Sequence, residues 1–249
     1  MSKVALVTGA AAGIGRAISL RLAQDGIAIG VLDLRTSDAQ ATVDAITESG
    51  GSAVALGADI SARDQVADAV ARLREELGPV TIVVNNAGIS GYTGFLDLTD
   101  DQWDRTMAVN LKGTFIVTQT VIPDMIAEQW GRIVNISSSS AQSGAPLMAD
   151  YSASKGGVIA LTKSLAQEFG RYNITCNNIP PRFVMNTVMS EQSPWADPKL
   201  DTRAAIIKAG PIQRQGEPAD IAGACAYLVS EEAGYVTGQT IGVNGGRYI

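Results

Sequence analysis

Short apolar runs alternate with amphipathic stretches along almost the whole chain, and this alternation constrains the fold more than any other feature of the sequence. The apolar runs typical of β-strands are 3–9, 27–34, 53–59, 81–88, 132–138, 174–179 and 240–243. They are continuously apolar, as in Thr-Ile-Val-Val at 81–84, which is typical of strands covered on both faces. Between them apolar residues recur at helical spacing, as at Ile14, Ala17, Ile18 and Leu22. The sequence therefore predicts an α/β fold, a Rossmann-like doubly wound parallel seven-stranded sheet with helices on both faces.

The chain has 249 residues, the size of one large α/β domain. No linker or internal repeat divides it, so we expect residues 1–249 to form a single domain. Residues 187–217 interrupt the alternation with Pro194, Pro198, Pro211 and Trp195. Ligands of doubly wound sheets bind beyond the carboxyl ends of the strands, and we expect this segment to form a lid over a substrate there.

Composition and charge exclude several kinds of protein. Without histidine, the chain has no histidine-assisted nucleophile and no histidine-ligated metal site. Cys176 and Cys225 form no CxxC motif, so we expect no metal. The net charge of −6 argues against nucleic acid as a partner. Glycines break the apolar N-terminal run well short of the roughly 18 residues of a membrane helix. We therefore expect a cytoplasmic protein with neither a nucleic-acid nor a membrane partner.

A glycine-rich segment, Thr-Gly-Ala-Ala-Ala-Gly-Ile-Gly at 8–15, follows the first predicted strand and opens the first predicted helix. Here glycines let the backbone approach a pyrophosphate, which the N–H groups and the positive end of the helix bind. Asp33 follows 18 residues after Gly15, close to the spacing of the acid that binds adenosine ribose hydroxyls. The segment predicts a bound dinucleotide; a tight turn without a ligand is the alternative.

Asp33 favours NAD over NADP. Two unit charges 4 Å apart interact by about 4 kcal/mol at an effective dielectric near 20, so a 2′-phosphate beside Asp33 is strongly disfavoured. Ala12 and Leu34 offer no compensating cation, whereas Arg35 is close enough to keep NADP as an alternative. A turn residue without a ligand is the other interpretation of Asp33.

Tyr151 and Lys155 are four residues apart in a stretch, 151–170, that predicts a helix. Both side chains then project from one face, about 6 Å apart along the axis. Moving the pKa of a tyrosine from about 10 to about 7 requires roughly 4 kcal/mol of preferential phenolate stabilisation. Lys155 and an oxidised nicotinamide would each supply part of this. Tyr151 is thus a candidate acid or base, with an ordinary surface pair as the alternative.

These features together resemble the short-chain dehydrogenase/reductase family in its compact single-domain form, nearly from end to end of the chain. The matching residues are the segment 8–15, Asp33, Asp59, Asn-Asn-Ala-Gly at 85–88, Asn110, Ser138, Tyr151 and Lys155. The resemblance implies a catalytic tetrad of Asn110, Ser138, Tyr151 and Lys155. In it Tyr151 exchanges a proton with the substrate oxygen and Ser138 hydrogen-bonds that oxygen. Lys155 also binds the nicotinamide ribose, and Asn110 holds a water in a proton relay.

The same resemblance implies the contacts with the cofactor. Asp59 and Ile60 are expected to flank the adenine, residues 86–88 to line the adenosine side, and Val184 to meet the carboxamide. The full expected set is Gly9, Gly13, Ile14, Gly15, Asp33, Leu34, Asp59, Ile60, Asn86, Ala87, Gly88, Tyr151, Lys155, Pro181, Val184 and Thr187.

The chain departs from the family pattern in the loop after the sixth predicted strand. The family has Pro-Gly with a threonine five positions after the proline, whereas this sequence has Pro180, Pro181 and Arg182, then Asn186 and Thr187. Arginine lacks the backbone freedom of glycine. We hypothesise that Arg182 faces the crevice and binds the pyrophosphate or an anionic substrate group; a solvated arginine is the alternative.

The main expectation is an NAD(H)-dependent oxidoreductase that interconverts a secondary alcohol and a ketone on a small or medium-sized, largely apolar substrate. Candidate pocket walls are Trp195, Met148, Met189 and 89–95. A 3-oxoacyl thioester reductase is the nearest alternative, although such family members generally use NADPH, which Asp33 disfavours. A non-catalytic dinucleotide-sensing protein is the other. The resemblance also implies a homotetramer built on helices around 99–129 and 151–170 and on the last strand.

Overall fold

A parallel sheet between two layers of helices forms the fold. The computed structural model describes residues 3–182, 184–185, 187–191, 202–208 and 210–248. Six strands pair in the order β3-β2-β1-β4-β5-β6, and every pairing is parallel. Their bounds are β1 Val4–Thr8, β2 Ala28–Asp33, β3 Ala53–Gly57, β4 Ile82–Asn85, β5 Gly131–Ile136 and β6 Ile174–Ile179. The order reverses between β1 and β4, which makes the carboxyl ends of these two strands the topological switch point.

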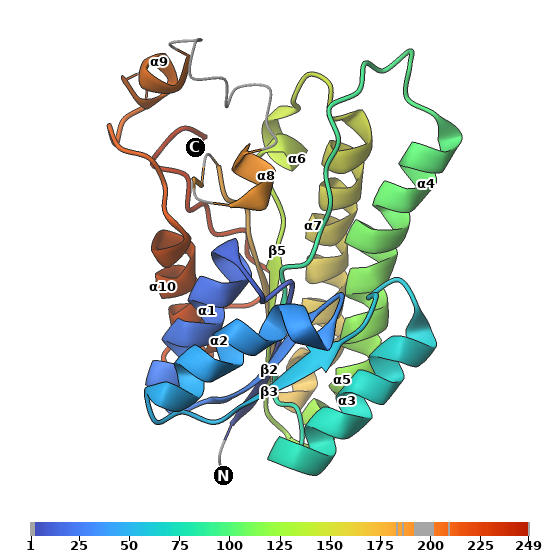
Figure 1. Ribbon diagram of the computed structural model, residues 1–249, viewed down its shortest axis with the longest axis vertical. Helices are drawn as coiled ribbons and strands as arrows, with labels where there is room; N and C mark the ends of the chain where they lie inside the picture. Colours follow the sequence, from blue (N-terminus) through green and yellow to red (C-terminus); the bar gives the residue numbers. More distant parts are fainter. Residues whose placement is uncertain (1–2, 183, 186, 192–201, 209, 249) are drawn as a thin grey trace.

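Helices cover both faces of the sheet, as predicted (Figure 1). One layer consists of α1 (Gly13–Gln24), α2 (Thr36–Glu48) and α10 (Pro218–Val229). The other contains α3 (Arg63–Leu77), α5 (Thr114–Glu128) and α7 (Ala149–Phe169), with α4 (Asp100–Met107) beside α7. Within β1, Ala5 and Val7 pack against the first layer, and Val4 and Leu6 against the second. Burial on both faces explains why the strand sequences are continuously apolar.

The prediction of a seventh strand at 240–243 is wrong: among the described residues this segment forms only isolated parallel bridges. Thr240 pairs with Asn178, and Val243 with Pro181. The physical reason lies in the neighbouring strand, because β6 ends at Ile179 and two prolines follow it. Proline has no N–H group to donate to a ladder, so the ladder is interrupted and only isolated bridges form.

The segment predicted to form a lid contains two short helices, α8 (Val188–Glu191) and α9 (Thr202–Lys208). Both lie at the end of the sheet where the strands finish, as does α6 (Ser140–Ser143) (Figure 1). The expected pocket wall Trp195 and the lid prolines Pro194 and Pro198 fall outside the described residues. No helix in the described parts of the chain is long and apolar enough to cross a membrane.

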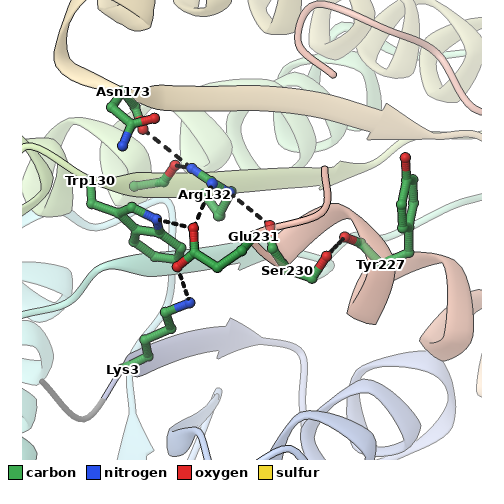
Figure 2. Close-up of polar contacts among 8 residues, drawn as sticks. Lys3, Trp130, Arg132, Asn173, Tyr227, Ser230 and Glu231 are labelled. Carbon is green, nitrogen blue, oxygen red and sulfur yellow. Dashed lines mark hydrogen bonds and ion pairs between the residues drawn. The ribbon is translucent and has the colours of Figure 1, made fainter. Parts of the chain in front are cut away.

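A polar cluster at the opposite end of the sheet, where the strands begin, links the segment after α10 to the start of β5 (Figure 2). Arg132 is only 1% exposed, and its guanidinium stacks 4.3 Å from the centre of the Trp130 ring. Glu231 accepts hydrogen bonds from Lys3 Nζ at 2.7 Å and from Trp130 Nε1 at 3.2 Å. The buried guanidinium also donates to the main-chain oxygens of Gly131, Asn173 and Ser230. The cluster thus compensates a buried charge with one carboxylate and three carbonyls.

The hydrogen bonds from Lys3 and Trp130 hold the pKa of Glu231 below its usual value. A lowered folded-state pKa contributes stability above the unfolded pKa, and this contribution is lost as the pH falls through the folded pKa. We expect Glu231→Gln to lower Tm by about 1–3 °C at pH 7 and the difference to vanish in acid, as measured by calorimetry. Glu232→Gln, with the same charge change at the next exposed residue, is the control. A Tm difference that is constant from pH 7 to pH 3 would contradict this.

Candidate active site

The turn between β1 and α1 packs against the end of β4 too tightly for side chains. A Cβ atom added at Gly15 would lie 2.2 Å from the oxygen of Gly9, and one added at Gly9 would lie 2.9 Å from Cα of Ala87. Gly9 also has a φ of +63°, which glycine adopts readily. Asn86 Nδ2 fixes the turn by donating to the main-chain oxygens of Thr8 at 2.9 Å and Gly9 at 3.0 Å.

Helix α1 begins at this turn without a side-chain cap at its N-cap residue, Ala12. The first N–H groups of a helix need partners from outside the helix, and a phosphate group satisfies them well. Gly9, Ala12, Gly13 and Ile14 all border one cavity of about 520 Å³. These residues therefore fit the diphosphate of a dinucleotide.

Asp33, at the end of β2, lies beside the glycine-rich turn. Its carboxylate accepts hydrogen bonds from the main-chain N–H of Ala11 and of Leu34, both at 2.9 Å. Each carboxylate oxygen keeps a further lone pair, so Asp33 can still accept from ribose hydroxyls. Arg35 is the cation because of which NADP remained an alternative cofactor. Its Nε donates to Asp38 at 2.9 Å, and this hydrogen bond raises the pKa of Arg35.

Tyr151 and Lys155 lie on α7 and are buried, 5% and 4% exposed, so they are not the surface pair that sequence spacing also allowed. Lys155 Nζ donates to the main-chain oxygen of Ile136 at 2.9 Å and lies 5.9 Å from the centre of the Tyr151 ring. Burial raises the pKa of Tyr151 to about 12, opposed by a hydrogen bond from Ser138 and reinforced by Tyr92. Burial also lowers the pKa of Lys155 to about 8. In the protein alone, desolvation therefore outweighs the expected lowering of the Tyr151 pKa by the lysine.

Asn110 is fully buried in a π-helical turn (Ala108–Gly113) between α4 and α5. Its side chain exchanges two hydrogen bonds with Ile89: Oδ1 accepts from the main-chain N–H at 2.8 Å, and Nδ2 donates to the carbonyl at 2.9 Å. Nδ2 also donates to Ser154 Oγ at 3.0 Å. The side chain thus fixes the loop after Gly88, and the water-holding role of Asn110 stays a prediction.

The cavity brings most of the predicted site residues together and leaves out a few. Those that line it are Gly9, Gly13, Ile14, Asp33, Asn86, Ala87, Gly88, Ser138, Tyr151, Lys155, Pro181, Val184 and Thr187, and the expected walls Met148 and Met189 also do. Gly15, Leu34, Asp59, Ile60 and Asn110 are absent from the lining. Asp59 Oδ1 accepts from the N–H and hydroxyl of Ser61 at 2.9 and 2.7 Å, and its expected contact with the adenine stays a prediction.

Several lining residues were not singled out by the sequence. Tyr92, Ser140, Ile207 and Arg247 face the cavity from four different segments. Tyr92 falls in the stretch 89–95 proposed as a wall, but nothing in the spacing distinguished it from its neighbours. The other three come from α6, α9 and the C-terminal segment, whose approach to the site depends on tertiary packing.

An enzyme that moves a hydride with a nicotinamide dinucleotide needs a cradle for the diphosphate and, beside it, a group that exchanges a proton. The cavity combines the glycine-rich turn at residues 8–15, which we call the cradle, with the phenol of Tyr151. A family model described as enoyl-(acyl carrier protein) reductase matches residues 9–247. The chain thus belongs to the short-chain dehydrogenase/reductase family, whose members bind a nicotinamide dinucleotide.

Relatives match over their full length. The chain is 38% identical to the 3-oxoacyl-(acyl-carrier-protein) reductase of Staphylococcus epidermidis over 100% of both chains. It is 40% identical to the (3R)-3-hydroxyacyl-CoA dehydrogenase of Mus musculus, over 100% of this chain and 97% of the relative. The crystal structure of a 3-oxoacyl-(acyl-carrier-protein) reductase from Brucella melitensis superposes with a TM-score of 0.91 at 34% identity, covering 99% of this chain and 91% of that one.

The tight approach at the cradle generates a test. We expect Gly15→Ala to lower the free energy of unfolding by about 1–3 kcal/mol and to weaken NADH binding, measured by urea denaturation and fluorescence titration. The control is Gly223→Ala in α10, where an added Cβ meets nothing within 4 Å. It should stabilise the protein by about 0.5–1 kcal/mol. A Gly15→Ala protein with the parent's stability and NADH affinity would rule out the close approach.

Proposed function

We propose that this protein is an NAD(H)-dependent oxidoreductase that interconverts 3-oxoacyl and 3-hydroxyacyl thioesters. The observation that carries the proposal is the meeting of Ser138, Tyr151 and Lys155 in one cavity with the glycine-rich cradle. The names of two relatives, a 3-oxoacyl reductase and a 3-hydroxyacyl dehydrogenase, describe one reaction at C3 of an acyl thioester. They favour this substrate class over the broader expectation of any secondary alcohol or ketone.

The bound nicotinamide supplies the hydride in reduction and accepts it in oxidation. In reduction, the phenol of Tyr151 donates its proton to the C3 oxygen, while Ser138 donates a hydrogen bond to the same oxygen. Lys155, which is buried beside it, then compensates the phenolate charge. A Tyr151 pKa of about 12 keeps the phenol protonated at neutral pH, which suits a proton donor.

The role of Tyr151 is tested with acetoacetyl-CoA as substrate and NADH oxidation as the signal. We expect Tyr151→Phe to lower kcat/KM by about 10²–10⁴-fold, the usual contribution of a general acid, while NADH still binds. The parent should also prefer acetoacetyl-CoA to cyclohexanone by at least about 100-fold in kcat/KM, since remote binding energy speeds the reaction. Equal rates with both ketones would instead support the broader interpretation, an oxidoreductase that acts on secondary alcohols and ketones in general. Binding of NADH without any reduction would support the dinucleotide-sensing alternative.

The choice of NAD(H) rests on Asp33, beside the cradle, and on the pairing of Arg35 with Asp38. We expect Asp33→Asn to reduce the preference for NADH over NADPH, as a ratio of kcat/KM values, by at least about tenfold, because a charge repulsion of up to about 4 kcal/mol is removed. Asp44→Asn, which makes the same charge change at a different place, on α2, should keep the parent's ratio. A parent that prefers NADPH would overturn this part of the proposal.

Two arginines favour a substrate that carries an anionic group. Arg182 and Arg247 both line the cavity, and among its described lining residues the only acid is Asp33, at the cradle. Arg182 Nη1 donates to Ser143 Oγ of α6 at 3.1 Å, and Arg247 Nη2 donates to the oxygen of Ile207 at 3.3 Å. Both guanidinium groups therefore lie toward α6 and α9, on the substrate side. Thioesters of CoA and of acyl carrier proteins each carry a phosphate, which arginine binds well.

We expect Arg182→Gln to raise KM for acetoacetyl-CoA about tenfold, the effect of losing one charged hydrogen bond, with little change for the uncharged N-acetylcysteamine thioester. Steady-state kinetics with the two thioesters measures this, and Arg72→Gln on α3 is the matched control. If KM rose equally for both thioesters, or if only the Kd for NADH rose, a role of Arg182 in substrate recognition would be excluded.

The expected homotetramer and cytoplasmic setting stay proposals. An apolar hollow on the outer surface of α4, α5 and α7 supports the assembly. It is lined by Asp104, Met107, Ala108, Leu111, Lys112, Phe115 and Leu161, and Phe115 is 41% exposed. Both cysteines are free thiols, which is consistent with a reducing compartment.

A further inference from the structure

The hydroxyl oxygen of Ser138 accepts two hydrogen bonds from Ser140, two positions further along the chain. Ser140 Oγ donates to Ser138 Oγ at 2.9 Å, and the main-chain N–H of Ser140 donates to the same atom at 3.1 Å. Ser140 is the first residue of α6 and is 8% exposed. Two donors from one residue therefore converge on the oxygen of Ser138, inside the wall of the cavity.

A serine hydroxyl has two lone pairs and one proton. The two donors of Ser140 occupy both lone pairs, so the hydroxyl proton of Ser138 is its one remaining hydrogen-bonding capacity. We infer that Ser140 is a positioning residue, which fixes Ser138 as a hydrogen-bond donor toward one oxygen at a time, that of Tyr151 or that of the substrate. The inference rests on the proposed function, because it concerns the acid–base step of that reaction.

The direction of this hydrogen bond affects the chemistry. As a donor, Ser138 stabilises negative charge on whichever oxygen faces it, and its bond to Tyr151 opposes the rise of the Tyr151 pKa caused by burial. Without the hydroxyl of Ser140, one lone pair of Ser138 becomes free. Ser138 can then turn and accept a hydrogen bond from the phenol, which favours the neutral form of Tyr151.

The test is the pH profile of 3-hydroxybutyryl-CoA oxidation by NAD, a direction in which Tyr151 must be deprotonated. For Ser140→Ala we expect the acid limb of kcat/KM to move upward by about 0.5–1 pH unit, the equivalent of one hydrogen bond. At neutral pH, kcat should fall about 3–10-fold with KM changed less than about twofold. Ser140→Thr keeps a hydroxyl and should restore the parent's profile. Ser140→Cys, with a weaker donor, should give an intermediate shift.

Ser139→Ala is the matched control, because it removes a neighbouring buried hydroxyl that makes no described hydrogen bond to Ser138. It should keep the acid limb of the parent. An unchanged acid limb in both Ser140→Ala and Ser140→Cys would overturn the inference while leaving the proposed function in place. The inference would also be overturned if the variants lost activity but all kept the parent's pH dependence, because a merely structural serine would give that result. A parent that oxidises no 3-hydroxyacyl thioester would instead overturn the proposed function, and the inference with it.

Discussion

The site depends on the hydrogen bonding between the ends of β1 and β4, where the order of the sheet reverses. Thr8 Oγ1 accepts from the N–H groups of Asn86 and Ala87, both at 3.0 Å, while the Asn86 amide donates back to the oxygens of Thr8 and Gly9. These side-chain bonds continue the contact of the two strands beyond their ladder. Because only glycine fits at Gly15 beneath this contact, the bare start of α1 stays open to a phosphate.

The same contact connects the cradle to the proton-transfer groups. A Cβ at Gly88 would lie 3.1 Å from Asn110 Oδ1 and 3.2 Å from Lys155 Nζ, so the loop after β4 passes directly over both. Asn110 holds the next residue, Ile89, through donor and acceptor at once. It can do so because the helix widens there into a π-turn, a feature that often marks functional sites. These contacts thus fix the loop after β4 over the side chains of Asn110 and Lys155.

Features that follow from periodicity and local chemistry were predictable from the sequence. The layered parallel fold follows from the alternation of continuously apolar runs with stretches of helical periodicity, and the cradle follows from glycines placed between a strand and a helix. The errors have tertiary causes. The seventh strand fails because Pro180 and Pro181 in the neighbouring chain segment lack donors. Ser140 was not distinguishable among four consecutive serines, since only the α6 turn aims its hydroxyl at Ser138.

Burial displaces the two central pKa values in opposite directions, raising that of Tyr151 to about 12 and lowering that of Lys155 to about 8. Desolvation penalises each charge alone, whereas a phenolate beside an ammonium is a neutral pair. Ionisation of the phenol is therefore favoured while Lys155 keeps its proton. A donor that Ser140 holds in one direction adds stabilisation to the ionised member of the pair without adding a charge. The site can thus form a phenolate from a buried phenol when the reaction runs toward the ketone.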